Sequence, residues 1–197
     1  TQVVAFLASP ASHGGAPVER IDTHASIVFL AGSRAWKLKR AVRYDYLDFS
    51  TVERRRAMCE AEVRVNRRTA PGLCRGVAPI TRQADGSLAI GGSGVPADWV
   101  VEMARFDREG LFDRLAEQGA LNLDLMRPLA TAIARLHQTA ERRSDHGGQA
   151  GMAWVVEGNA TGLAEQGAGI LDRADCAELT RMSRREVERH GALLESR

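Results

Sequence analysis

An alternation of apolar and basic residues over residues 35–42 is the feature of this sequence best suited to chemistry. Side chains alternate between the two faces of a strand, so the pattern predicts a strand that carries Ala35 and Lys37 on one face. A small residue beside a lysine leaves room for a flat ring next to a cation, and a lysine ammonium can bind phosphate groups. Lys39 shares that face and is the second choice, because it would place the bulky charge of Lys37 where such a ring would lie.

The helix expected after this strand supplies two candidate carboxylates. Ser50 and Glu53 have the spacing of a capping box, which predicts a helix over residues 51–68. Glu60 and Glu62 lie about 200° apart around that helix, so both cannot face the lysine. Spacing alone leaves the choice between them open, and by itself it favours an ordinary surface lysine and a solvated glutamate.

The remaining patterns predict strands first and helices afterwards. Residues 1–16 hold a short apolar patch followed by a loop signal, and residues 144–170 are interpreted as a connector rich in glycine and alanine. This order predicts an α+β protein in two layers or lobes. Strands are expected at residues 18–21, 25–30, 35–42, 77–82, 88–90 and 99–104, and helices at 51–68, 111–118, 123–139 and 173–195.

The composition argues against several classes of protein. Hydrophobic residues at 44% and charged residues at 26% are ordinary for a folded soluble domain, and a net charge of +2 indicates neither a nucleic-acid nor a membrane partner. The three cysteines have no metal-ligand spacing and suit reduced thiols in a cytoplasmic protein. No apolar run is long enough to span a membrane. Because the chain lacks an initiator methionine, we expect it to be part of a longer protein.

Other residues that could suggest a function have ordinary structural explanations. The arginines of residues 54–68 are interleaved with glutamates and have no aromatic companions, which favours a solvated helix face over a nucleic-acid site. His24 is interpreted as a hydrogen-bonding residue of a turn, and His137 as a residue that stabilises a helix end. The glycines of residues 91–94 precede no helix, so they form a poor phosphate cradle.

Several longer runs resemble the aminoglycoside-phosphotransferase-like proteins of bacteria, which have a protein-kinase-like fold and are often fused to a P-loop kinase-like domain. The similarity runs from about residue 17 to residue 140. It implies a protein-kinase-like N-lobe, an antiparallel sheet plus one helix, at residues 1–104, and the first helices of an incomplete C-lobe at 105–197. The runs are THASIVFLAGSRAWKLKR from residue 23, YLDFST from 46, CEAEVRVNRR from 59, GVAPIT from 76 and LH from 136.

The resemblance also implies roles for the residues introduced above. Lys37 would bind the phosphates of ATP, and Glu62, chosen by its distance from the end of the helix, would hold Lys37 in place. Ala35 would lie against the adenine, as the alanine does in the V-A-I-K motif of protein kinases.

Two further parts of the nucleotide site follow from the resemblance. The turn that contains Thr23 and Ser26 takes the place of a glycine-rich loop, and a hydroxyl group or a backbone amide there would contact phosphate. The strand ending at residue 104 would lead into the hinge, where backbone groups near Glu102, Met103 and Ala104 would bond the adenine edge.

The chain departs from the family at the catalytic loop. The H-G-D-L-H-type stretch and the later metal-binding aspartate are absent from the sequence, and His146-Gly147-Gly148 is the nearest approach. We therefore expect the Mg²⁺ ligands to lie outside this chain and the fragment to be inactive alone. The implied partners are ATP, an unknown small-molecule phosphate acceptor and a possible P-loop domain. The alternative is a catalytically dead, kinase-like interaction or regulatory module.

Overall fold

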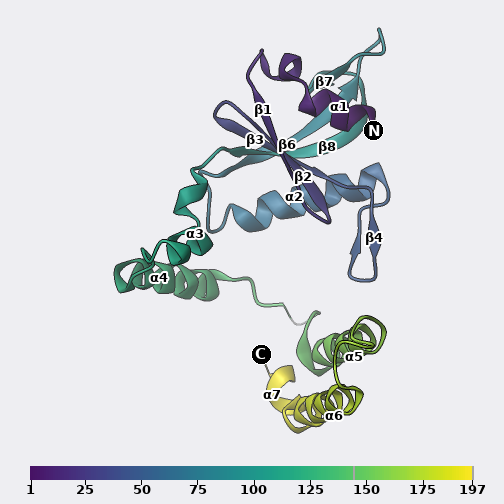
Figure 1. Cartoon of the computed structure of the whole chain (residues 1–197), viewed down its shortest axis with the longest axis vertical. Helices are drawn as coiled ribbons and strands as arrows, with labels where there is room; N and C mark the ends of the chain where they lie inside the picture. The colour runs from purple at the N-terminus through teal and green to yellow at the C-terminus, as the bar shows by residue number, and fades with distance from the viewer. Residues whose placement is uncertain (144, 197) are drawn as a thin grey trace. The chain divides into compact units, whose positions relative to one another are not determined.

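The computed structural model describes residues 1–143 and 145–196, in which an antiparallel sheet is followed along the chain by helices (Figure 1). The chain forms two compact units, Thr1–Gln138 and Thr139–Arg197, and each is described by itself. The α+β class predicted from the sequence is confirmed. The predicted lobe boundary at residue 104 stays a prediction. The first compact unit extends past it and includes residues 105–138.

The first unit is built on a six-stranded sheet in which every neighbouring pair of strands is antiparallel. The predicted strands are present, but the one expected over residues 35–42 ends at Lys39, and the last one begins four residues earlier than expected, at Val95. A hairpin of β4 (Arg43–Tyr44) and β5 (Leu47–Asp48) forms a separate small sheet. The order in the large sheet is β1 (Val18–Asp22), β2 (Ser26–Ala31), β3 (Arg34–Lys39), β8 (Val95–Ala104), β6 (Cys74–Arg82) and β7 (Leu88–Ile90).

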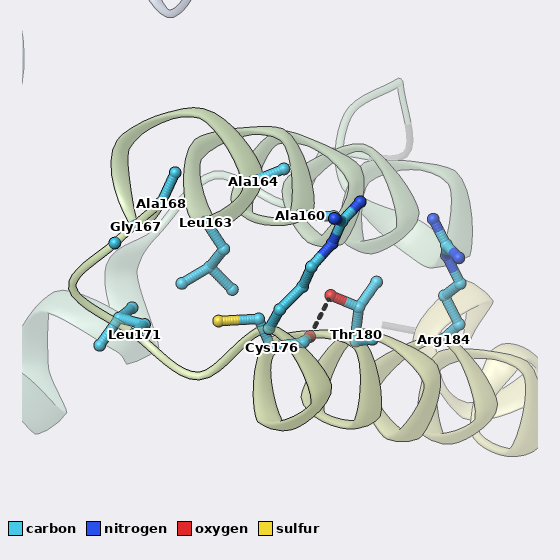
Figure 2. A pocket seen from close by; sticks show the side chains of 12 residues that line it. Ala160, Leu163, Ala164, Gly167, Ala168, Leu171, Cys176, Thr180 and Arg184 are labelled. Atoms are coloured by element: carbon cyan, nitrogen blue, oxygen red, sulfur yellow. Dashed lines mark hydrogen bonds between the residues drawn. The ribbon is translucent and has the colours of Figure 1, made fainter.

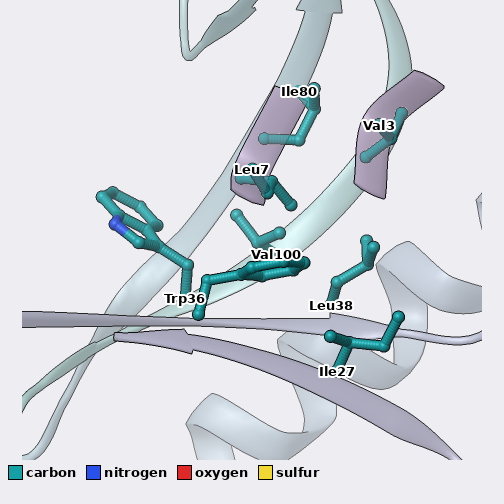
Figure 3. Packing of buried hydrophobic residues seen from close by; sticks show 8 residues of the cluster. Val3, Leu7, Ile27, Trp36, Leu38, Ile80 and Val100 are labelled. Carbon is teal, nitrogen blue, oxygen red and sulfur yellow. The ribbon is translucent and has the colours of Figure 1, made fainter. Parts of the chain in front are cut away.

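One face of the sheet is apolar and is covered by helix α1 (Gln2–Ala8), which the sequence did not predict. Trp36 and Leu38 point to this face because they alternate with the lysines of β3. Val3 and Leu7 are four residues apart, so they project from one side of α1 into the same cluster (Figure 3). The apolar patch at the start of the chain is therefore part of the core.

Truncating Leu7 tests whether α1 belongs to this core. Leu7 is fully buried, so Leu7→Ala is expected to lower the free energy of unfolding by about 2 kcal/mol, near the low end for such changes because α1 is short. Denaturant unfolding would measure the difference. Val65→Ala, at a position 55% exposed, is the matched control and should change little. An effect of Leu7→Ala no larger than the control's would contradict this packing.

Helix α2 (Val52–Asn66) covers the opposite face of the sheet. Its Cys59 and Val63 pack against Val101 of β8. The helix was predicted correctly, but its N-cap was not. Thr51 caps it by accepting a hydrogen bond from the Arg54 amide at 3.2 Å, whereas Ser50 donates its hydroxyl to Asp48 at 2.6 Å. A nearby aspartate therefore takes the hydroxyl that was expected to cap the helix.

Helical segments follow the sheet within the first unit. The helix expected over residues 111–118 is present as α3 (Phe112–Glu117), and a short 3₁₀ turn, η2 (Arg108–Gly110), precedes it. Helix α4 (Leu123–Thr139) has the predicted bounds and continues through Pro128, which lies in its second turn.

The second unit is a group of helices, of which the sequence predicted the last but not the first. The segment interpreted as a connector contains the helix α5 (Gly148–Gln166); its residue 144 lies outside the described residues. Strong helix formers within α5 and its packing against α6 (Arg173–Arg189) offset the cost of its glycines. An exposed ion pair of 2.6 Å also joins Glu157 to Arg184. The single last helix expected is divided into α6 and α7 (Gly191–Glu195).

Candidate functional site

The centre of the candidate site is one carboxylate held between two ammonium groups. The Nζ atom of Lys37 lies 2.8 Å from Glu62 Oε1, and the Nζ atom of Lys39 lies 2.6 Å from Glu62 Oε2. Each carboxylate oxygen therefore accepts a hydrogen bond from a different lysine. The ion pair predicted between Lys37 and Glu62 is present, and Lys39 shares the same partner.

The two lysines differ in their access to solvent. The side chain of Lys37 is 31% exposed, whereas that of Lys39 is 6% exposed. The Nζ atom of Lys39 also lies 4.8 Å from the centroid of the Phe49 ring, which is buried. A bound anion could thus reach the ammonium of Lys37 more directly than that of Lys39.

The protonation of Glu62 reflects two opposing effects. Partial burial acts to raise the pKa of its carboxyl group, because it disfavours the charged form. The hydrogen bonds from Lys37 and Lys39 outweigh this effect and hold the pKa below its ordinary value of 4.5. At neutral pH the site therefore contains two positive charges and one negative charge, a net charge of +1.

The period of helix α2 decides which glutamate enters the site. Arg55, Cys59 and Val63 are the buried residues of the helix, and Glu62 lies on the same side because it is seven residues after Arg55. Glu60 is exposed and pairs with Arg56 at 2.8 Å. The choice that spacing left open is thus settled in favour of Glu62.

A buried ion pair fixes helix α2 to the sheet near its other end. The guanidinium of Arg55 donates two hydrogen bonds to the carboxylate of Asp98 in β8, at 2.8 Å and 3.0 Å. A third bond, of 2.9 Å, goes to the carbonyl oxygen of Phe49. These bonds connect the helix, the strand and the residue whose ring covers Lys39.

Three more of the predicted site residues lie on the same face of the sheet as the lysines. Ala35 pairs with Met103 across β3 and β8, and Ser26 pairs with Lys39 across β2 and β3, so each pair shares one face. Ala35 and Ser26 are buried, and Met103 packs against the apolar cluster beneath α2. Lys37 is therefore flanked along its strand by a small residue on one side and by the second lysine on the other.

The residues expected to lead into the hinge are still part of the sheet. The side chain of Glu102 lies on the opposite face, where its carboxylate is 3.4 Å from Arg34 and 3.6 Å from Arg75. The amide of Ala104 donates to the carbonyl of Leu73 at 2.9 Å, so that amide already has an acceptor. The amide of Ala104 is therefore not free to donate to a ligand.

The turn between β1 and β2 is closed by one of its own hydroxyl groups. Thr23 Oγ1 accepts from the Ser26 amide at 2.9 Å and donates to the Ser26 carbonyl at 3.0 Å. The carbonyl of His24 accepts a bond of 3.4 Å from the Tyr44 hydroxyl of the β4–β5 hairpin. The Thr23 hydroxyl is thus occupied within the turn, and His24 lies in a turn, as interpreted from the sequence.

Two contributors to the site were missed from the sequence, the shared ion pair of Lys39 and the ring of Phe49. The strand alternation placed both lysines on one face, but it could not say that one carboxylate would lie between them. Phe49 lies two residues before the N-cap Thr51, and its apolar side chain between the polar residues Asp48 and Ser50 is a sequence signal that could have indicated its burial.

A separate hollow of about 640 Å³ lies in the second unit, between α5 and α6 (Figure 2). Leu163, Leu171 and several alanines supply its apolar lining. Two of its polar groups already have partners: the Thr180 hydroxyl donates to the Cys176 carbonyl at 2.9 Å, and Arg184 pairs with Glu157. The hollow contains none of the predicted site residues.

The described part of the chain contains neither a metal-binding cluster nor a helix suited to span a membrane. Within residues 1–143 and 145–196, no three histidine, cysteine, aspartate or glutamate side chains converge as a metal site would require. Among the helices formed by the same residues, none combines the length and the apolar character of a membrane span.

Burial raises the pKa of the Cys59 thiol to about 11, which keeps this cysteine protonated and unreactive at neutral pH.

Part of this chain is similar to curated proteins of mycobacteria. Uncharacterized proteins of Mycobacterium bovis and of two strains of Mycobacterium tuberculosis are each 34% identical to this chain over 126 residues, which is 61% of this chain and 22% of theirs. The chain thus spans about a fifth of the length of these curated relatives. No protein-family profile matches the chain. No solved structure is significantly similar to it.

Proposed function

We propose that residues 1–104 form the ATP-binding lobe of a phosphotransferase of the aminoglycoside-phosphotransferase-like, protein-kinase-like type. The observation that carries this proposal is the ion pair between Lys37 of β3 and Glu62 of α2. In protein kinases a lysine of the third strand contacts the α- and β-phosphates, and a glutamate of the following helix holds that lysine. The antiparallel sheet with α2 packed on the lysine-bearing face supports the same assignment.

The contacts of this chain with ATP follow from the positions of its residues. The ammonium of Lys37, whose side chain is partly exposed, would donate charge-assisted hydrogen bonds to phosphate oxygens. Glu62 would keep the Lys37 side chain extended from the sheet. Ala35, two residues nearer the end of β8, would leave space for the adenine ring. The bond to the adenine edge would come from backbone groups after Arg105, because the amides of Ala104 and Arg105 already donate to Leu73 and Ser33.

The activity of the whole protein is inferred from this lobe. ATP supplies the phosphoryl group, and the acceptor we propose is a small hydroxylated molecule. The described residues offer no metal-binding cluster, so we derive no role for Mg²⁺ from this chain. The three cysteines are free thiols, which suits a reducing compartment such as the cytoplasm. A P-loop domain is the partner we propose, by resemblance.

Neutralising Lys37 tests the nucleotide assignment. Lys37→Met is expected to weaken ATP binding at least tenfold, because a charge-assisted hydrogen bond contributes about 1.5–3 kcal/mol. Isothermal titration of ATP into each protein would measure the dissociation constants. Arg56→Met is the matched control, since Arg56 is an exposed cation of α2 that pairs with Glu60 and not with Glu62.

Two results would contradict the assignment. One is a folded wild-type protein that does not bind ATP, and the other is a Lys37→Met variant whose affinity equals that of the control. ATP binding by this chain, combined with no phosphate transfer by the full-length protein, would instead favour a catalytically inactive, kinase-like module.

A further inference from the structure

Lys39 is a buried cation that the proposed contact with ATP does not use. Its side chain is 6% exposed, and its ammonium is enclosed by the Glu62 carboxylate at 2.6 Å and the Phe49 ring at 4.8 Å. Transferring an ammonium group out of water costs several kcal/mol unless a partner compensates it. Glu62 is that partner, although it already pairs with the more exposed Lys37.

The position of Lys39 is fixed by its neighbours. Phe49, whose ring covers the ammonium, is itself held by the bond of 2.9 Å from Arg55 to its carbonyl oxygen. Arg55 in turn is held by Asp98 of β8. Lys39 therefore cannot extend to a ligand without breaking its pair with Glu62 and displacing a buried ring.

The effect of Lys39 on a ligand is thus electrostatic. Lys37 and Glu62 alone would form a neutral pair, and the carboxylate would oppose the attraction of Lys37 for phosphate. Lys39 offsets the charge of Glu62 from the buried side, so the three groups together keep a net charge of +1. In a partly desolvated place, such a charge acts over several ångströms.

We propose that Lys39 is a positioning residue that holds Glu62 from beneath and leaves the positive charge of Lys37 available to a polyphosphate. The nucleotide part of this inference rests on the proposed ATP-binding function. The ligand class that the charge selects is a polyphosphate, and the preference is expected to grow with the number of phosphate groups.

The test compares three ligands with Lys39→Met. Methionine is close to lysine in length, and Glu62 keeps Lys37 as its partner, so no buried charge is left unpaired and the variant is expected to fold with the Lys37–Glu62 pair intact. The dissociation constant for ATP should rise about tenfold and that for ADP by less, whereas that for adenosine should change less than twofold. The salt dependence of ATP binding should become weaker. Lys39→Gln, which is also neutral and can still donate to Glu62, replaces the methionine variant should it fail to fold.

A probe without the base separates this inference from the nucleotide assignment. Inorganic tripolyphosphate carries the charge of ATP but no adenine, so wild type should bind it and Lys39→Met should bind it about tenfold more weakly. Equal losses for ATP and adenosine would indicate a purely structural role and overturn the inference, as would unchanged affinity for both ATP and tripolyphosphate. A wild type that binds tripolyphosphate but shows no preference for ATP would overturn the proposed function and leave the role of Lys39 standing.

Discussion

Replacing Asp98 with alanine is expected to lower the free energy of unfolding by about 3–5 kcal/mol. The guanidinium of Arg55 is 7% exposed and would lose both hydrogen bonds to Asp98 while remaining buried. The Trp99 amide would also lose its bond of 2.8 Å to the same carboxylate. The loss is large because water cannot easily replace these partners in the space between α2 and β8.

Denaturant unfolding followed by tryptophan fluorescence would measure this change. A Trp154→Phe background confines the signal to Trp36 and Trp99, which both lie in the first unit. Glu60→Ala, which breaks the exposed pair with Arg56 on the same helix, should cost about 0.5 kcal/mol or less. The double replacement Arg55→Met with Asp98→Leu should recover part of the stability, because it leaves no buried charge unpaired. A loss below about 1 kcal/mol for Asp98→Ala would show that water reaches Arg55 after all.

Glu62→Gln is expected to be the second most damaging change, with a loss of about 2–3 kcal/mol at pH 7. The amide cannot compensate two ammonium groups, so Lys37 and Lys39 would repel each other across it, and Lys39 is the more buried of the two. The figure is smaller than for Asp98 because Lys37 is partly solvated. Glu60→Gln, two residues away on the same helix and exposed, is the control and should change little.

The loss caused by Glu62→Gln should also depend on pH. The pKa of Glu62 in the folded chain lies below the ordinary value of 4.5, so the carboxylate stabilises the fold fully above that value and loses its contribution as the pH falls further. The difference between wild type and Glu62→Gln should therefore be constant from about pH 5.5 to 7 and narrow below pH 4.5. The facing groups are the ammonium groups of Lys37 and Lys39 and the thiol of Cys59, whose pKa burial raises to about 11. A difference independent of pH down to 3 would contradict this assignment.

The sequence was most informative where one physical rule acts alone. The alternation around Trp36 and Leu38 correctly separated the apolar face of β3 from the face with the lysines, because successive side chains of a strand point to opposite faces of the sheet. The helix predicted over residues 123–139 has the same bounds in the structure, where it is α4. The pairing of Lys37 with Glu62 came from the family resemblance, since spacing alone favoured an ordinary solvated pair.

The predictions failed where two local preferences compete or where a distant segment decides. Ser50 and Thr51 can both cap a helix, and only the position of Asp48 determines which hydroxyl is free to do so. The glycines of α5 indicated a connector, but α6 provides a packing partner that no local rule reveals. Helix α1 was missed for the same reason, because it is too short to be stable without the sheet.

The two ion pairs of α2 fix the rotational phase of that helix against the sheet. Arg55 and Glu62 are seven residues apart, close to two full turns, so both can face the strands at once, about 10 Å apart along the axis. Inserting or deleting one residue between them would turn the far end by about 100° and carry the carboxylate away from the lysines. Changes of length in this segment therefore cannot be absorbed locally, whereas substitutions on the outer side of the helix can.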